Sequence, residues 1–198
     1  MAPPSKIEIR EFSLKARKGL SREELEELSS AVMKNVISSP EYKVSKVVAT
    51  YVSKSGEVKT EGIIRDSLRT GKRVLVPVSR PENTSLIFSE LRNYESELAP
   101  GRFGVREPTS QYLRPVPLGE ADLILVPLVA WDDRGHRLGY GKGYFDSALA
   151  GAGISPITMG LGLESQQVSR IPEDEHDVPL RAIATEGRVI RFGRQRVT

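Results

Sequence analysis

The sequence predicts an α/β fold, because short apolar runs rich in β-branched residues alternate with helical segments from residue 40 onward. Such alternation is typical of a largely parallel sheet whose ligands collect at the carboxyl ends of the strands. The length of 198 residues and the 38% content of hydrophobic residues suit a single compact domain, expected to cover residues 1–198.

The first 40 residues are expected to be helical. Residues 5–8 and 21–24 have the spacing of a capping box, in which a serine and a glutamate three positions later bind free backbone N–H groups. After the second box, four apolar residues recur at helical spacing and form one face: Leu25, Leu28, Val32 and Val36. Pro40 is expected to end this helix.

Strands and helices then alternate. A βαβ unit is expected from a strand at 46–52, a helix at 60–69 closed by Gly71, and a strand at 73–78. Further strands are expected at 85–91, 122–131, 156–163 and 182–192, the last finishing the sheet. The proline-rich segment 100–117 is expected to be an ordered loop, because its apolar side chains are costly to leave in water.

Composition excludes several chemistries. The chain has no cysteine, so disulfides, thiolate nucleophiles and iron–sulfur clusters are ruled out. Its two histidines, His136 and His176, lack zinc-hydrolase spacing, so a hard cation such as Mg²⁺ is the expected metal. A net charge of +3 is weak evidence for nucleic-acid binding. Without an apolar run that spans a bilayer or a signal-peptide stretch, the protein is expected to be cytoplasmic, with no membrane or nucleic-acid partner.

The most informative segment is the glycine-rich stretch 134–146, which follows an apolar strand. Three glycines occupy alternate positions in it, so the backbone can turn tightly and bring its N–H groups against a ligand: Gly139, Gly141 and Gly143. A helix is expected to start near Tyr144, and its positive end adds to the charges of Lys142 and Arg137. The segment therefore predicts a phosphate-binding loop.

Common templates do not fit this loop. The P-loop needs GxxxxGK[ST], and the dinucleotide fingerprint GxGxxG would need a third glycine where Tyr144 stands. From spacing alone, a generic turn between a strand and a helix remains the alternative.

Residues 137–146, RLGYGKGYFD, resemble the R-x-G-x-G-x-G-Y-[Y/F]-D signature of the 5-formyltetrahydrofolate cyclo-ligase family. The likeness extends over nearly the whole chain: Lys6 and Arg10 resemble a K-x-x-x-R pair, GEVKT at 56–60 an E-[IV]-x-T segment, FGVREP at 103–108 an aromatic-G-I-x-E-P loop, and Thr185-Glu186 a late T-E. The family's fold implies a three-layer, mostly parallel sheet of the NagB/RpiA/CoA-transferase-like type.

The resemblance implies ATP-dependent ring closure, in which a formyl oxygen attacks the γ-phosphate and a second folate nitrogen closes on the activated carbon. The implied catalytic residues are Lys142, Arg137 and Glu57. The implied ATP contacts are Lys6, Arg10, Arg137, Gly139, Gly141, Lys142, Gly143 and Tyr144. Mg²⁺ is expected on Asp146 and Asp177.

For the reduced folate, the implied contacts are Val52, Glu57, Phe103, Trp131 and Tyr144. Glu57 suits pterin N–H groups because an ionised acceptor binds them strongly, and the aromatic residues suit flat rings. Read without the resemblance, Trp131 fits the core equally well, Glu57 fits a turn, and Asp177 fits a solvated acidic loop. His136 is expected to be a loop residue. We expect a monomer or a weak dimer.

The chain also departs from the family pattern. Arg181 stands where a second aspartate of a D-x-x-x-D arrangement is usual, and we expect it to place positive charge near the metal. Phe145, Trp131 and Leu128 differ from the usual tyrosine, phenylalanine and glycine. Two rival hypotheses follow: a non-catalytic nucleotide or folate sensor, supported by Arg181, and an RNA-associated module, suggested by the basic tail at 188–196.

Overall fold

The computed structural model describes residues 4–80, 82, 85–101, 104–153, 155–175 and 177–193. Its helices are α1 Lys6–Lys18, α2 Arg22–Ser38, α3 Pro40–Val44, α4 Glu61–Arg69 and α5 Tyr144–Ala152, with short 3₁₀ turns η3 Ser110–Tyr112, η4 Leu118–Glu120 and η5 Glu164–Gln166. Its strands are β1 Val47–Thr50, β2 Arg73–Arg80, β3 Ser85–Leu91, β4 Leu98–Pro100, β5 Arg106–Pro108, β6 Pro115–Val116, β7 Leu123–Pro127, β8 Ala130–Trp131, β9 Arg137–Leu138, β10 Ile157–Leu161, β11 Ala182–Ala184 and β12 Val189–Arg191.

The main sheet has the order β12-β11-β10-β7-β1-β2-β3-β6. Its five central strands run parallel, while β12, β3 and β6 at the two sides pair antiparallel with their neighbours. The predicted βαβ unit is confirmed, since β1 and β2 are parallel and α4 connects them. A mixed, mostly parallel α/β sheet is therefore the fold.

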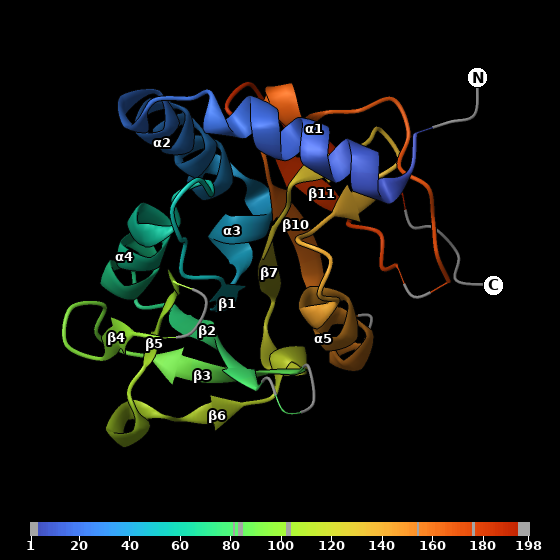
Figure 1. Cartoon of the computed structure of the whole chain (residues 1–198). Coiled ribbons are helices and arrows are strands. Elements are labelled where there is room, and N and C mark those ends of the chain that lie inside the picture. The colour runs from blue at the N-terminus through green and yellow to red at the C-terminus, as the bar shows by residue number, and fades with distance from the viewer. Residues whose placement is uncertain are drawn as a thin grey trace.

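Helices cover both faces of this sheet (Figure 1). On one face, α2, α3 and α4 pack on alternate strand residues such as Val48, Leu123 and Leu125. On the other face, α5 and η4 pack on the residues between them, such as Ala49 and Ile124. Strand side chains alternate in direction, so each strand contributes to both halves of the core. Within the described part of the chain, no helix has the length and apolar character needed to cross a membrane.

The two capping boxes form as expected. The side chain of Ser5 accepts from the backbone N–H of Glu8, and that of Ser21 accepts from the backbone N–H of Glu24. The helix α2 ends at Ser38, as the following proline predicts, but Pro40 also begins α3. Proline suits the first turn of a helix because its missing N–H would have no partner there.

Three predicted segments are corrected. The strand expected at 122–131 ends at Pro127, after which the backbone N–H of Val129 turns to the carbonyl of Leu138, 2.6 Å away. The segment 182–192 forms a hairpin of two antiparallel strands, because Thr185 and Arg188 bind each other across its turn. The segment 100–117 is not all loop, since it contains β5 and β6.

Candidate active site

A tight hairpin places the glycine-rich loop at the carboxyl end of β7. The strands β8 and β9 pair, and Asp132 in their turn accepts from the backbone N–H groups of Arg134, His136 and Ile171 at 3.0–3.1 Å. Burial alone would raise the pKa of Asp132, but these hydrogen bonds and the Arg134 side chain outweigh it and lower the pKa. An ionised, buried carboxylate therefore fixes the start of the loop.

Two glycines give the loop its shape. Gly141 and Gly143 have φ values of +89° and +70°, which side chains rarely tolerate, and α5 begins directly after Gly143. A Cβ at position 141 would lie 3.3 Å from Cζ of Arg10. The carbonyl of Gly139 accepts from Nε of Arg10 at 2.9 Å, so the N-terminal helix is fastened to the loop.

The loop forms one wall of a cavity of about 650 Å³, which we call the loop cavity. Its described lining is Lys6, Arg10, Tyr51, Val52, Lys54, Glu57, Pro77, Ser79, Leu86, Val105, Glu107, Pro127, Arg137–Asp146, Asp174 and Asp177. Several of these residues lie at or just beyond the ends of β1, β2 and β7, where a parallel sheet gathers its ligands. Most of the predicted site residues therefore meet in one place, although they come from both ends of the chain.

Lys6 connects the first helix to the acidic segment near residue 175. Its ammonium lies 2.5 Å from Oδ2 of Asp177 and 2.7 Å from Oδ2 of Asp174. Burial lowers the pKa of Lys6, but the two carboxylates outweigh that effect and raise it above the usual value. Asp177 is thus not part of a purely solvated loop.

Arg137 holds Asp146 in position. One terminal nitrogen donates to the carbonyl of Val178 at 2.6 Å, and the other donates to Oδ1 of Asp146 at 2.7 Å. Its side chain is only 4% exposed, and burial lowers its pKa while the Asp146 carboxylate opposes that change. Because both terminal nitrogens bind protein oxygens, its predicted direct contact with a phosphate stays a prediction.

The carboxylates of Asp146 and Asp177 fit a magnesium site. Both line the loop cavity and both raise the pKa of the same arginine, Arg137, so they flank one point. Mg²⁺ needs only one or two protein carboxylates when phosphate oxygens and water supply the remaining ligands. Among the described residues, no cluster of three metal-ligating side chains occurs.

Glu57 lines the loop cavity beside Tyr140. Its carboxylate is buried and accepts from the backbone N–H of Lys54 at 3.0 Å. Burial raises the pKa of Tyr140 to about 12, and the Glu57 carboxylate acts in the same direction, so the phenol stays protonated beside it. The hydroxyl of Tyr140 also accepts from Arg17 at 2.6 Å. Glu57 therefore combines the hydrogen bond of a turn residue with a place in the cavity wall.

Two predictions about the site are corrected. Trp131 is fully buried, and its indole N–H donates to the carbonyl of Leu163 at 3.0 Å, so it belongs to the core and offers no face to a ligand. Arg181 does not line the loop cavity; its backbone N–H binds the carbonyl of Thr158 near the start of β10. The charge change at Arg181 therefore lies at the opposite end of the strands. Phe103 and His176 lie outside the described residues.

Several lining residues were not predicted. Tyr140 and Lys54 stand in the segments already singled out, at the alternate position of the glycine loop and in the turn before Glu57. Glu107 accepts from the backbone N–H of Ser79 at 3.1 Å. Tyr140 and Glu107 stand within quoted motifs and Lys54 stands two residues before one, but spacing alone does not give the direction of a side chain.

The fold and site together define an α/β protein with a glycine-lined cavity, rich in charged side chains of both signs, at the carboxyl ends of its parallel strands. A family model described as the 5-formyltetrahydrofolate cyclo-ligase family matches residues 2–186. The chain belongs to this family, which confirms the resemblance seen in the sequence.

Individual relatives agree with this assignment. The chain is 30% identical over 174 residues to the 5-formyltetrahydrofolate cyclo-ligase of Escherichia coli (strain K12), covering 87% of this chain and 96% of that protein. It is 33% identical to a probable 5-formyltetrahydrofolate cyclo-ligase of Caenorhabditis elegans, covering 94% and 95%. The NMR structure of Aquifex aeolicus 5,10-methenyltetrahydrofolate synthetase superposes with a TM-score of 0.82 at 34% identity, covering 98% of this chain and 95% of that one.

Proposed function

We propose that the protein is an ATP-dependent cyclo-ligase that converts 5-formyltetrahydrofolate into 5,10-methenyltetrahydrofolate, ADP and phosphate. Family membership supports the activity. The observation that carries the proposal is that the buried carboxylate of Glu57 lines the same cavity as the glycine loop with its cations. Such a cavity can hold a nucleotide triphosphate beside a pterin ring.

The nucleotide would lie along the glycine loop. Lys142 is a compact cation on the exposed side of the loop, and the N-terminus of α5 adds positive potential. Lys6 and Arg10 lie on the same helix at the same wall and serve the remaining phosphates. Asp146 and Asp177 would hold Mg²⁺, which neutralises charge on the phosphate oxygens when bound.

The folate would lie against Glu57. The formyl oxygen attacks the γ-phosphorus, and ADP leaves with the bridging oxygen. N10 then attacks the activated carbon and loses its proton, and phosphate leaves with the former formyl oxygen. Glu57 accepts from pterin N–H groups, while Val52 and Tyr144 supply apolar contact. A contact from Phe103 belongs to the same proposal.

Broader properties are proposed with the activity. We assign the mostly parallel sheet to the NagB/RpiA/CoA-transferase-like type, residues 1–198 to one domain, and the protein to the cytoplasm as a monomer or weak dimer. Arg181 no longer supports a sensor without turnover, because it lies away from the loop cavity. In the described part of the basic tail, Arg188 pairs with Glu164 and Arg191 with Glu41, which weakens the RNA hypothesis. Residues 194–196 of that tail lie outside the described residues.

An absorbance assay tests the proposal. Purified protein is incubated with 5-formyltetrahydrofolate, ATP and Mg²⁺, and the near-ultraviolet band of the methenyl product is followed. We expect product only when all three are present. Absence of product, with ATP still raising the melting temperature, would favour the sensor hypothesis instead.

A further inference from the structure

A cluster of ion pairs lies outside the loop cavity, at the turn between β8 and β9. The carboxylate of Asp132 is fully buried and accepts from Nε and one terminal nitrogen of Arg134, at 3.2 and 2.7 Å. The other terminal nitrogen of Arg134 donates to the carboxylate of Glu173. None of these three residues belongs to the described lining of the loop cavity, so the function proposed above does not use them.

The cluster holds the backbone of Ile171 on both sides. The N–H of Ile171 donates to Oδ2 of Asp132 at 3.0 Å, and its carbonyl accepts from a terminal nitrogen of Arg134 at 2.8 Å. That nitrogen and that carboxylate oxygen also bind each other. The contacts therefore close a ring around one residue of the backbone, which fixes its position and its orientation.

The residues that follow Ile171 need such attachments. Those that the structure describes form neither helix nor strand before β11, so no regular hydrogen-bond ladder holds them. At the far end of this segment, the carbonyl of Val178 accepts from Arg137, and the N–H of Leu180 donates to the carbonyl of Gly135 at 2.9 Å. The segment is thus tied at both ends to the hairpin of β8 and β9.

The two proposed metal ligands depend on this common support. Asp177 lies on the segment itself, and Asp146 is held by Arg137, which belongs to β9. Mg²⁺ demands near-ideal positions of its oxygen ligands. A small displacement of the segment relative to the hairpin would therefore separate the two carboxylates from one common ion.

We propose that Arg134 is a positioning residue of the metal site: by fixing the backbone of Ile171, it sets where Asp177 stands relative to Asp146. This inference rests on the proposed function, because it takes Mg²⁺ to lie on these two aspartates. Arginine suits the role better than lysine, because its planar group reaches several protein oxygens from fixed directions, whereas an ammonium is a single point.

Calorimetric titration with ATP, once with Mg²⁺ and once with EDTA in its place, measures how much the metal strengthens nucleotide binding. In Arg134→Gln we expect this gain to fall by about tenfold, with the affinity in EDTA unchanged. Amide hydrogen exchange of the ligand-free protein should become faster in the segment 171–180. Arg134→Lys keeps a cation beside the buried Asp132, so it should fold like the wild type and lose about threefold of the gain.

Arg170→Gln is the matched control. Arg170 is exposed and also pairs with Glu173, at 3.6 Å, but it is not part of the ring around Ile171. This variant should therefore keep the wild-type gain from Mg²⁺ and the wild-type exchange rates. If it behaves like Arg134→Gln, the effect belongs to the charge of Glu173 and the proposal is wrong.

The remaining outcomes also decide the matter. Equal weakening of ATP with and without Mg²⁺ would mean that Arg134 acts on the glycine loop or on folding. An undiminished gain in both Arg134 variants would show that Asp177 keeps its place without the ring. A wild type that binds ATP equally with and without Mg²⁺ would overturn the proposed metal site and this inference with it. Absence of turnover in the assay above would overturn the proposed activity separately, because the readouts here are binding and exchange.

Discussion

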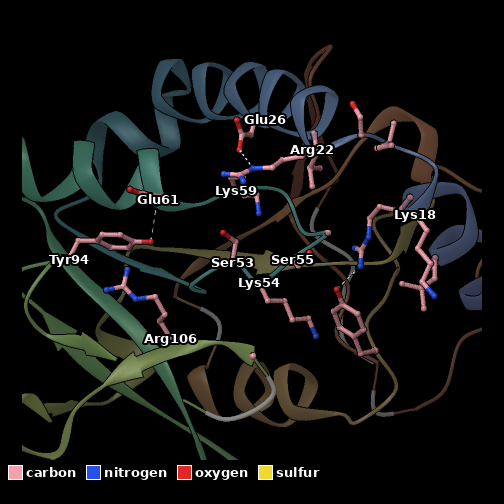
Figure 2. Close-up of a pocket in the computed structure, with 18 residues that line it drawn as sticks. Lys18, Arg22, Glu26, Ser53, Lys54, Ser55, Lys59, Glu61, Tyr94 and Arg106 are labelled. Carbon is pink, nitrogen blue, oxygen red and sulfur yellow. Dashed lines mark hydrogen bonds and ion pairs between the residues drawn. The ribbon is translucent and has the colours of Figure 1, made fainter. Parts of the chain in front are cut away.

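In the loop cavity the charges of the described lining are balanced, with five cations and five carboxylates. A second cavity of about 1130 Å³, the basic cavity, whose lining residues are drawn in Figure 2, shares Lys54 and Tyr140 with it and has six cations and two carboxylates in its described lining. Lys6 and Arg137 are each in contact with aspartates in the first cavity. In the second, the ion pairs of the described residues include none with Lys18 or Lys59.

The proposed function accounts for the balance of charge in the loop cavity. Carboxylates beside cations weaken the attraction for a bare anion, but they can hold a metal ion that accompanies a triphosphate. In the basic cavity the cations outnumber the carboxylates, so an anion at its wall would meet a net positive potential.

The strongest test of the contrast is Lys142→Ala. We expect kcat to fall by about 10²- to 10³-fold, because a cation that follows the transferred phosphoryl group is removed. The melting temperature should stay unchanged, because Lys142 is exposed. The absorbance assay measures the first quantity and thermal unfolding the second, with Lys34→Ala as the control. Retention of full activity would remove the glycine loop from the chemistry.

Asp177→Asn tests the proposed metal site of the loop cavity. We expect the Mg²⁺ concentration for half-maximal activity to rise by about tenfold, since a carboxylate in the proposed metal site is lost. Asp174→Asn is the matched control, because Asp174 also binds Lys6 but its side chain is 71% exposed. If both variants raise the requirement equally, the effect comes from Lys6 and not from the metal.

Gly141→Ala tests the shape of the loop. An alanine with φ near +89° and its Cβ 3.3 Å from Cζ of Arg10 is strained, and we expect a loss of about 1–2 kcal/mol in the free energy of unfolding. The KM for ATP should rise as well, because Arg10 must move. Gly139→Ala is the control: its φ is not in the left-handed range and a Cβ would contact nothing within 4 Å. Equal loss in both variants would contradict the argument.

The smallest effect concerns Tyr140, which lines both cavities. Its folded pKa of about 12 exceeds the ordinary value of 10, so its contribution to stability is complete below pH 10 and is lost as the pH rises through 12. In Tyr140→Phe, the free energy of unfolding should decline less over this pH range than in the wild type. The difference should be less than about 1 kcal/mol, because the residue is partly exposed. An unchanged decline would show that Tyr42, whose pKa is also raised to about 12, dominates.

Local patterns predicted local structure well. The serines that begin α1 and α2, the βαβ unit, and the helix after Gly143 all depend on residues a few positions apart. The same is true of the glycine loop, whose backbone needs were readable from residue type. The break at Pro127 was missed because an apolar run looks the same whether it continues straight or folds into a hairpin.

The sequence did not predict which residues far apart along the chain come together in the fold. The basic cavity combines segments around residues 17, 55, 94, 106 and 140, and no spacing connects them. Arg181 stands four positions after Asp177, yet Asp177 lines the loop cavity and Arg181 lies beside Thr158 at the far end of β10. The burial of Trp131 was also not predictable, because neighbouring residues of a strand point to opposite faces and one position decides between the core and a pocket.

The attachment of Lys6 to Asp177 has a consequence for how the molecule comes into being. These partners are 171 positions apart, and Ile9 beside them packs on Ala130, Leu138 and Ile171. During synthesis the first helix emerges before the surface on which it docks, and its last partner, Asp177, follows only 171 positions later. A nascent chain, or one shortened before residue 171, would therefore carry the glycine loop without the contacts of the first helix to Ile171 and Asp177.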